Sequence, residues 1–146
     1  MKNKVINEMK LILPSYPENE AVARGCLSQF VSRADPTVSE LADIRCAVSE
    51  AVTNCVVHAY KGGAGLIYIN ARLYENGRFT VRITDKGCGI PDVSLAMTPL
   101  YTTDSGGERS GMGFAIMQTF ADKVTVRSKV GSGTRVFMEK QLGRRV

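Results

Sequence analysis

The sequence contains no tryptophan, a single histidine and no apolar run near the roughly 20 residues that a membrane-spanning helix needs. Its first residues also lack the sustained apolar stretch and small-residue cleavage site of a secretory signal peptide. We therefore expect a cytoplasmic protein without a membrane segment. With 146 residues, 44% of them hydrophobic, the chain suits one domain and is too short for two ordinary ones. It is expected to form a single domain over residues 1–146.

The four cysteines do not form the patterns of a metal site. Cys26, Cys46, Cys55 and Cys88 include no C-x-x-C pair, and His58 does not lie at zinc-finger spacing from any of them. Free cysteines are usually small buried apolar residues. We expect buried free thiols rather than thiolate metal ligands.

Basic residues exceed acidic ones, which gives a formal net charge of +5. An excess of this kind attracts nucleic acid or an acidic protein surface when it is concentrated in one place. Along the sequence the basic residues are scattered and are not interleaved with aromatic residues, although Lys140, Arg144 and Arg145 form a basic end. The sequence predicts a solvated basic surface and no direct nucleic-acid binding.

Hydrophobic periodicity divides the chain into helices and hairpins. Helical spacing covers 22–31, a longer segment from Thr37 or Ser39 to about His58, and 111–121. A short strand is expected at 9–13. Two hairpins are expected, from 66–74 with 79–84 and from 124–129 with 134–140. The α+β pattern predicts a two-layer α/β sandwich, with helices on one face of a mixed, mostly antiparallel sheet.

Residues 91–110 show no periodicity and hold two prolines and a Gly-Gly pair. A loop of this length in a compact domain usually has a function. We expect it to be a mobile lid.

Two common nucleotide motifs are missing: there is no G-x-x-x-x-G-K-[ST] and no complete G-x-G-x-x-G between a strand and a helix. Any nucleotide site must be of another kind. Glu50 and Asn54 are four residues apart, so that one helix face presents both. An amide oxygen is a suitable ligand for Mg²⁺, and a carboxylate can act as general base on a hydroxyl. The simpler interpretation is a polar helix edge in solvent.

Two glycine-rich segments offer complementary chemistry. Asp85 ends an expected strand just before Gly87 and Gly89, where its carboxylate can accept a hydrogen bond from an exocyclic amine. Gly111 and Gly113 open the last helix, whose N-terminus can hold phosphate. Alternatively, the first segment is an ordinary turn and the second a flexible loop.

In this order and spacing, these segments and the late Gly133-Thr134 resemble the N, G1, G2 and G3 boxes of the Bergerat-fold ATPases, which include gyrase, heat-shock chaperones, histidine kinases and MutL. SEAVTN followed by His58-Ala-Tyr60, and the segment 108–114, resemble the anti-sigma factor serine kinases, in particular those of sporulation. The resemblance covers nearly the whole chain. It implies a protein that binds ATP and Mg²⁺.

The resemblance also implies a role for each matching residue. Glu50 would be the catalytic base and Asn54 the Mg²⁺ ligand, while Asp85 would contact adenine. The remaining nucleotide-binding positions would be Gly87, Gly89, Thr103, Arg109, Gly111, Gly113 and Thr134. Lys86 and Cys88 depart from the residues common in relatives; Lys86 would add positive charge near the nucleotide. His58 is expected to be structural.

The implied function is to bind and inhibit the sporulation sigma factor F in an ATP-dependent way and to phosphorylate a serine of its anti-anti-sigma factor. A homodimer is implied as well, and Arg24 lies at a position that faces partner proteins in the family. Two alternatives stay open: a stress-response anti-sigma kinase of the same family, and an ATP-gated binding module with little kinase activity.

Overall fold

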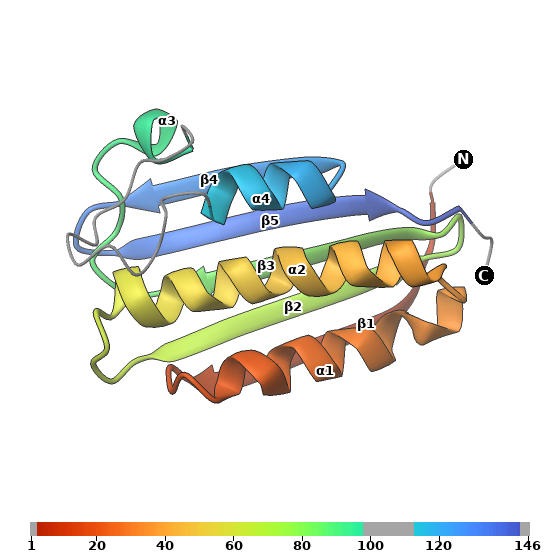
Figure 1. Ribbon diagram of the computed structural model, residues 1–146, viewed down its shortest axis with the longest axis horizontal. Coiled ribbons are helices and arrows are strands. Elements are labelled where there is room, and N and C mark those ends of the chain that lie inside the picture. The colour runs from red at the N-terminus through yellow and green to blue at the C-terminus, as the bar shows by residue number, and fades with distance from the viewer. Residues whose placement is uncertain (1–2, 98–112, 144–146) are drawn as a thin grey trace.

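The computed structural model has two layers, a five-stranded sheet and a set of helices that covers one of its faces (Figure 1). It describes residues 3–97 and 113–143. The strands are β1 (Val5–Pro14), β2 (Leu66–Tyr74), β3 (Arg78–Asp85), β4 (Lys123–Lys129) and β5 (Gly133–Gln141). The helices are α1 (Asn19–Val31), α2 (Val38–Asn54), α3 (Val93–Ala96) and α4 (Gly113–Phe120), with a 3₁₀ turn η1 (Ser32–Ala34) and a π turn η2 (Cys55–Ala59). The predicted two-layer sandwich is confirmed.

The strands lie in the order β1-β2-β3-β5-β4, and both predicted hairpins are present. All four pairings among the described strands are antiparallel, so the expectation of a mixed sheet was wrong. The reason is the last hairpin: β3 and β4 run in the same direction, but β5 returns between them and pairs with both. This insertion brings the end of β3 beside the start of β5.

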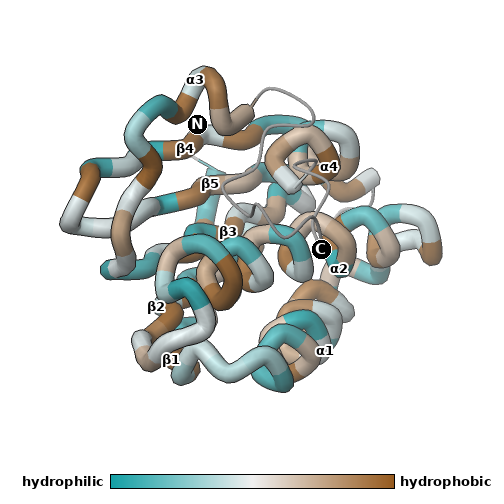
Figure 2. The backbone as a smooth tube through the Cα atoms, turned by 60° about the vertical axis from the view of Figure 1, so that its left-hand side comes forward, coloured by the Kyte–Doolittle hydropathy of each residue, from teal (hydrophilic) through white to brown (hydrophobic). Residues whose placement is uncertain are grey.

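Helix α2 is the central element of the helical layer. Thr37 caps it through a reciprocal pair of hydrogen bonds with Glu40, as the sequence predicted for this position. The inward face of α2 buries Ile44, Ala47, Val48, Ala51 and Val52. Seen from the side, α1, α2 and α4 lie together over one face of the sheet (Figure 2). The opposite face of the sheet is covered by no described helix.

The core lies between these two layers. Inward and outward positions alternate along β2 and β3, because successive side chains on a strand point to opposite faces, although outward Thr80 is also buried. Burial of each large aliphatic residue here contributes about 1.5–3 kcal/mol. The inward residues are Ile67, Ile69, Ala71, Leu73, Phe79, Val81 and Ile83.

Three expectations need correction. Strand β1 begins at Val5 rather than residue 9, because its pairing with β2 continues through the polar residues Glu8 and Asn7 to Val5. A short helix, α3, forms within the segment expected to be an irregular lid, and residues 98–110 of that segment lie outside the described residues. Of the cysteines, Cys55 is buried, but Cys46 and Cys88 are exposed.

No helix in the described segments, 3–97 and 113–143, has the length and hydropathy to cross a membrane.

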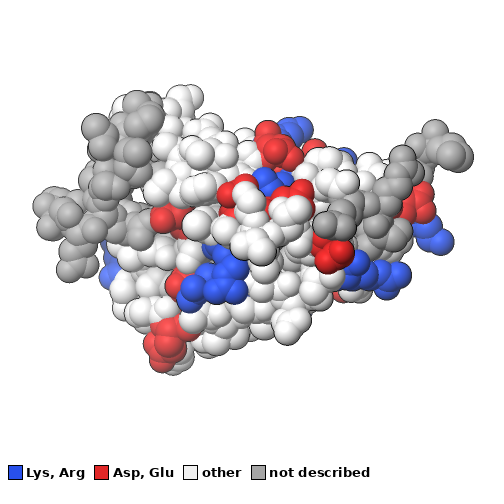
Figure 3. All heavy atoms as spheres, turned by 45° about the vertical axis from the view of Figure 1, so that its right-hand side comes forward, with Lys and Arg blue, Asp and Glu red and all other residues white. Residues whose placement is uncertain are grey.

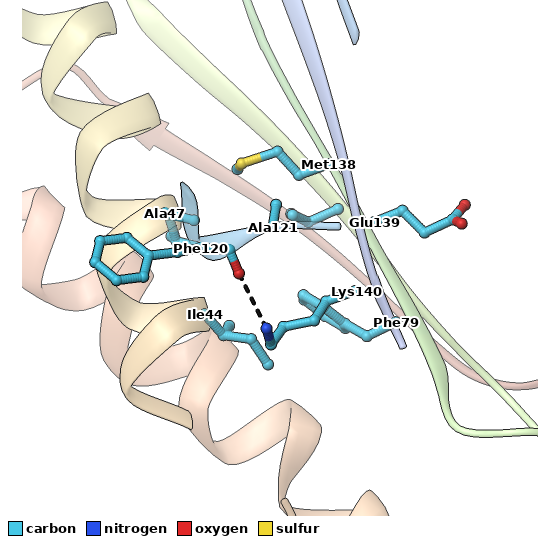
Figure 4. Close-up of a pocket in the computed structure, with 10 residues that line it drawn as sticks. Ile44, Ala47, Phe79, Phe120, Ala121, Met138, Glu139 and Lys140 are labelled. Atoms are coloured by element: carbon cyan, nitrogen blue, oxygen red, sulfur yellow. Dashed lines mark hydrogen bonds between the residues drawn. The ribbon is translucent and has the colours of Figure 1, made fainter. Parts of the chain in front are cut away.

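The C-terminal end of α4 is fixed to the sheet by Lys140. The Lys140 ammonium donates to the Phe120 carbonyl at 3.0 Å (Figure 4). It also donates to the Asp43 carboxylate at 3.2 Å. Its aliphatic stem packs beside Ile44 and Phe79 at the edge of the core. One cation thus connects β5, α2 and the last turn of α4, where a positive charge also complements the helix dipole.

Replacement of Lys140 by Met keeps the stem and removes the cation. We expect Lys140→Met to lower the free energy of unfolding by about 1–2 kcal/mol, because two partly buried acceptors lose a charged donor. Urea denaturation of the variant measures this change, with Lys10→Met on the exposed side of β1 as control. An equal effect of the two substitutions would show that the Lys140 contacts contribute nothing.

Candidate functional site

A cavity of about 320 Å³ opens between the end of α2, the ends of β3 and β5, and the start of α4. Its lining includes five residues that the sequence singled out, although they are far apart along the chain: Asn54, Asp85, Gly89, Gly113 and Thr134. The volume is within the range of small-molecule sites. The lining is mostly apolar with a few polar groups, which is typical of sites that bind a planar organic ligand.

Asp85 is the most buried charged residue at this site, with 6% of its surface exposed. One carboxylate oxygen, Oδ1, accepts from the backbone N–H of Gly87 at 2.9 Å and of Thr134 at 3.2 Å. The other, Oδ2, accepts from the thiol of Cys55 at 3.6 Å. These three donors fix the carboxylate in one orientation at the wall of the cavity.

Burial raises the pKa of the Asp85 carboxyl above its ordinary value of 3.8, and the N–H groups of Gly87 and Thr134 oppose this rise. Burial, together with the nearby Asp85 charge, also raises the pKa of the Cys55 thiol well above its ordinary value. Cys55 is therefore protonated at neutral pH and acts as a hydrogen-bond donor. A buried carboxylate with remaining acceptor capacity can recognise an amine of a ligand.

The turn after Asp85 requires glycine at two positions because backbone approaches it closely. A Cβ on Gly87 would lie 2.4 Å from the Ala59 carbonyl oxygen. Gly89 has φ of +78° and lies against the Lys129 carbonyl, 2.3 Å from where its Cβ would be. The two glycines thus let the turn pack between η2 and the end of β4.

Tyr60 connects this turn to two other segments. Its hydroxyl accepts from the backbone N–H of Lys86 at 2.7 Å and donates to the carbonyl of Leu66 at 2.6 Å. Its ring covers Gly65, whose Cβ would lie 2.3 Å from a ring carbon. The ring and hydroxyl together hold the start of β2 and the turn after β3 in one position.

Asn54 lines the cavity, and Glu50 lies one helical turn before it on α2, next to the start of α4. A Cβ on Gly113 would lie 3.2 Å from the Asn54 amide and 3.4 Å from Glu50 Oε2. The absence of a side chain on Gly113 therefore leaves the carboxylate and the amide accessible from the start of α4. The predicted association of these three residues is present.

Other predicted residues have more limited support. Thr134 is buried, and its hydroxyl lies 2.8 Å from that of Ser128. Gly87 does not line the cavity; its backbone N–H donates to the Asp85 carboxylate. Lys86 extends over the ring of Tyr68, 5.1 Å from its centre, and does not line the cavity, contrary to expectation. Thr103, Arg109 and Gly111 lie outside the described residues.

Sequence reasoning missed three contributors. Cys55 was interpreted only as a free thiol, and Tyr60 only as part of a resemblance. Ser128, in β4, was not considered. Its hydroxyl accepts from the N–H of Ile90 at 2.7 Å and donates to the carbonyl of Gly133 in β5. Their partners are 5 to 38 residues away in sequence and follow no regular spacing, so sequence patterns could not have identified them.

Comparison with known proteins agrees with this geometry. Residues 13–140 match the model of the histidine kinase-like ATPase domain. The anti-sigma F factor of Caldanaerobacter subterraneus subsp. tengcongensis is 49% identical over 94% of this chain and 96% of its own. This chain belongs to the anti-sigma F factor family of histidine kinase-like ATPases. Another member, from Priestia megaterium, is 43% identical over 93% of both chains.

Solved structures show the same fold at lower identity. The RsbU and RsbW domains of Rv1364c from Mycobacterium tuberculosis superpose with a TM-score of 0.67 at 19% identity, over 96% of this chain and 33% of that one. The mycobacterial sensor histidine kinase MprB gives 0.58 at 17% identity, over 94% of this chain and 100% of that one. The ATPase family implies ATP binding, and this cavity is the candidate site for it.

Asp85→Asn should separate binding from stability. The pKa of the Asp85 carboxyl is higher in the folded protein than in the unfolded chain, so the folded protein binds the carboxyl proton more tightly. The contribution of Asp85 to the free energy of unfolding therefore falls as pH rises from about 4 through the raised pKa. We expect Asp85→Asn to be at least as stable as wild type at pH 7, with the difference shrinking toward pH 3. ATP affinity should fall about tenfold or more.

Thermal unfolding between pH 3 and 8 and calorimetric titration with ATP measure both quantities. If the variant loses stability most strongly at pH 7, the ionised carboxylate stabilises the fold and this assignment is contradicted.

Tyr60→Phe tests the connection made by the tyrosine hydroxyl. Its removal leaves the Lys86 N–H without its acceptor, so we expect ATP affinity to fall about three- to tenfold. Hydrogen exchange at the Lys86 amide should accelerate. The control is Tyr16→Phe, since Tyr16 is 57% exposed and lies outside the cavity lining. Unchanged exchange and unchanged affinity would exclude this role.

Proposed function

We propose that this protein is an anti-sigma factor that binds and inhibits the sporulation sigma factor F when ATP is bound, and that phosphorylates a serine of the matching anti-anti-sigma protein. The observation that supports the kinase part is the placement of Glu50 and Asn54 beside Gly113, with Asn54 and Gly113 lining the same cavity as Asp85. A nucleotide base at Asp85 then directs its phosphates toward an amide and a carboxylate. The names of the relatives support the choice of partner.

The adenine end of the pocket provides recognition. The free lone pairs of Asp85 accept from the exocyclic amine of adenine, and the apolar wall around Ala51 and Val136 covers the base. Cys55 holds the carboxylate from behind, which keeps it from turning away when the pocket is empty. Binding therefore costs little reorganisation.

The phosphate end provides the chemistry. Asn54 would hold Mg²⁺ through its amide oxygen, and the fit is good because this hard ligand faces space left open by Gly113. When bound, Mg²⁺ neutralises phosphate charge during transfer. Glu50 would accept the proton of the substrate serine hydroxyl as that oxygen attacks the γ-phosphorus, and ADP would leave. Positioning supplies most of the rate, and the base contributes on the order of 10² to 10⁴.

Partner exchange would follow the nucleotide. The expected lid, residues 91–110, begins beside the cavity at Pro91 and Ala96, so its order can depend on the γ-phosphate. Thr103, Arg109 and Gly111 would contact phosphate from this segment. A cytoplasmic homodimer, with Arg24 on the surface that meets partner proteins, completes the proposal. Arg24 forms an ion pair with Glu20 at 2.9 Å in the isolated chain.

Phosphoryl transfer to the anti-anti-sigma protein tests this function. The protein is incubated with γ-labelled ATP, Mg²⁺ and that acceptor, and acid-stable phosphate on serine is counted. Glu50→Gln should reduce transfer about 100-fold or more while ATP affinity changes little. Glu75→Gln, in the exposed β2–β3 turn, is the matched control.

Two results would overturn parts of the proposal. A wild type that binds ATP and sigma factor F without transferring phosphate would be an ATP-gated binding module. Transfer only to the acceptor of a stress-response system, with no affinity for sigma factor F, would place the protein in that regulatory system instead.

A further inference from the structure

The face of the sheet away from the helices carries most of the excess positive charge. Strand alternation and register assign its outward residues, and basic side chains greatly outnumber acidic ones there. The two acidic residues are Glu8 and Glu139. The eight basic residues are Lys10, Arg72, Arg78, Arg82, Lys123, Arg127, Lys129 and Arg135. On the side shown in Figure 3, by contrast, basic and acidic groups lie next to one another.

Both acidic residues already have basic partners. Glu8 pairs with Arg72 at 2.9 Å, and Glu139 pairs with Arg78 at 3.6 Å. Among the residues that the structure describes, no carboxylate lies within 4 Å of the cationic groups of Arg82, Arg127, Lys129 or Arg135. All four are exposed. We call these four residues, with Phe137 between them, the basic patch.

The register concentrates charge within the basic patch. Arg127 lies directly opposite Arg135 on the β4–β5 ladder, and Arg82 lies directly opposite Phe137 on the β3–β5 ladder. Like charges in directly opposite positions destabilise a sheet. Basic residues do protect edge strands from aggregation, which accounts for β4. That explanation does not extend to Arg135 and Arg82, because β5 and β3 are interior strands.

We propose that the basic patch binds single-stranded nucleic acid, with phosphates at the arginines and a base stacked on Phe137. Neighbouring strands are about 4.8 Å apart, so the patch spans about 10 Å from β3 to β4, enough for about two nucleotides. Arginine forks suit phosphate oxygens, and a half-buried aromatic ring among cations is the usual platform for an unpaired base.

Other occupants fit the patch less well. An acidic peptide added to the free edge of β4 would contact Arg127 and Lys129 but would not reach Arg82, two strands away. A second copy of the chain would place one basic patch against another. A duplex would bury its bases and leave Phe137 without a stacking partner.

This site is independent of the ATP pocket. The pocket lies among the helices and the inward side of the sheet, whereas the basic patch is on the outward side. The residues were predicted not to bind nucleic acid because they are scattered in sequence. Folding gathers them from three strands around one aromatic ring.

Fluorescence anisotropy with a labelled 12-nucleotide oligo-dT or oligo-rU tests the proposal on the full chain. About two phosphates on the basic patch predict a slope of about −1.4 for log affinity against log salt concentration. The Arg82→Gln/Arg127→Gln/Arg135→Gln triple variant should bind at least tenfold more weakly, with a slope near −0.7. The control triple Lys4→Gln/Lys10→Gln/Arg33→Gln removes the same charge from other exposed positions and should bind within about twofold of wild type.

Phe137→Ala separates stacking from charge. It should weaken binding about fivefold or more and leave the salt slope unchanged. Circular dichroism and thermal unfolding show that each variant is folded.

Four results would overturn the proposal. The first is a wild type that does not bind either oligonucleotide at 50 mM salt, and the second is an equal loss of oligonucleotide affinity in both triple variants. The third is a wild-type affinity for poly-glutamate equal to that for the oligonucleotides, and the fourth is a change of oligomeric state in the Arg82→Gln/Arg127→Gln/Arg135→Gln variant. The third result would indicate an acidic protein partner, and the fourth an interface between copies of this chain. None of the four depends on whether the kinase proposal holds.

Discussion

The candidate ATP pocket depends on one buried carboxylate. Asp85 ends β3, and its three donors come from the following turn, from β5 and from the end of the helical layer. Without this carboxylate the N–H groups of Gly87 and Thr134 would have no acceptor, and the pocket wall would lose the contact between its three segments. Burial disfavours the ionised carboxylate. The same low-dielectric surroundings strengthen a hydrogen bond from a ligand amine to its remaining lone pairs.

The sheet order explains why this arrangement is possible. Since β5 inserts between β3 and β4, Thr134 lies directly opposite Asp85 in the β3–β5 register. The helical layer then closes the site, because the π turn η2 brings Cys55 under the carboxylate and Ala59 against Gly87. Lys140 holds the far end of α4, so that its first residue, Gly113, stays beside Glu50 and Asn54. The same packed layers thus bring the proposed adenine contact, Asp85, and the proposed Mg²⁺ ligand, Asn54, to one cavity.

Much of this could be predicted from the sequence, and the reasons are local. Helical spacing placed Glu50 and Asn54 on one face, hairpin turns predicted four of the five strands, and the Asp85 turn followed from its glycines. What failed was long-range: the position of β5, the role of Tyr60 and the direction of Lys86 depend on residues distant in the chain. The grouping of Arg82, Arg127 and Arg135 on one face could not be predicted for the same reason, since these residues come together only through strand register.

The central claim, that Asp85 recognises an adenine amine in this cavity, is tested most directly by comparing the affinities of wild-type protein for ATP and ITP in calorimetric titrations. Inosine replaces the amine donor with a carbonyl acceptor and keeps the ribose and phosphates. The account predicts that ITP binds about tenfold more weakly or worse, because its oxygen would face the buried carboxylate. Equal affinities for the two nucleotides would contradict it.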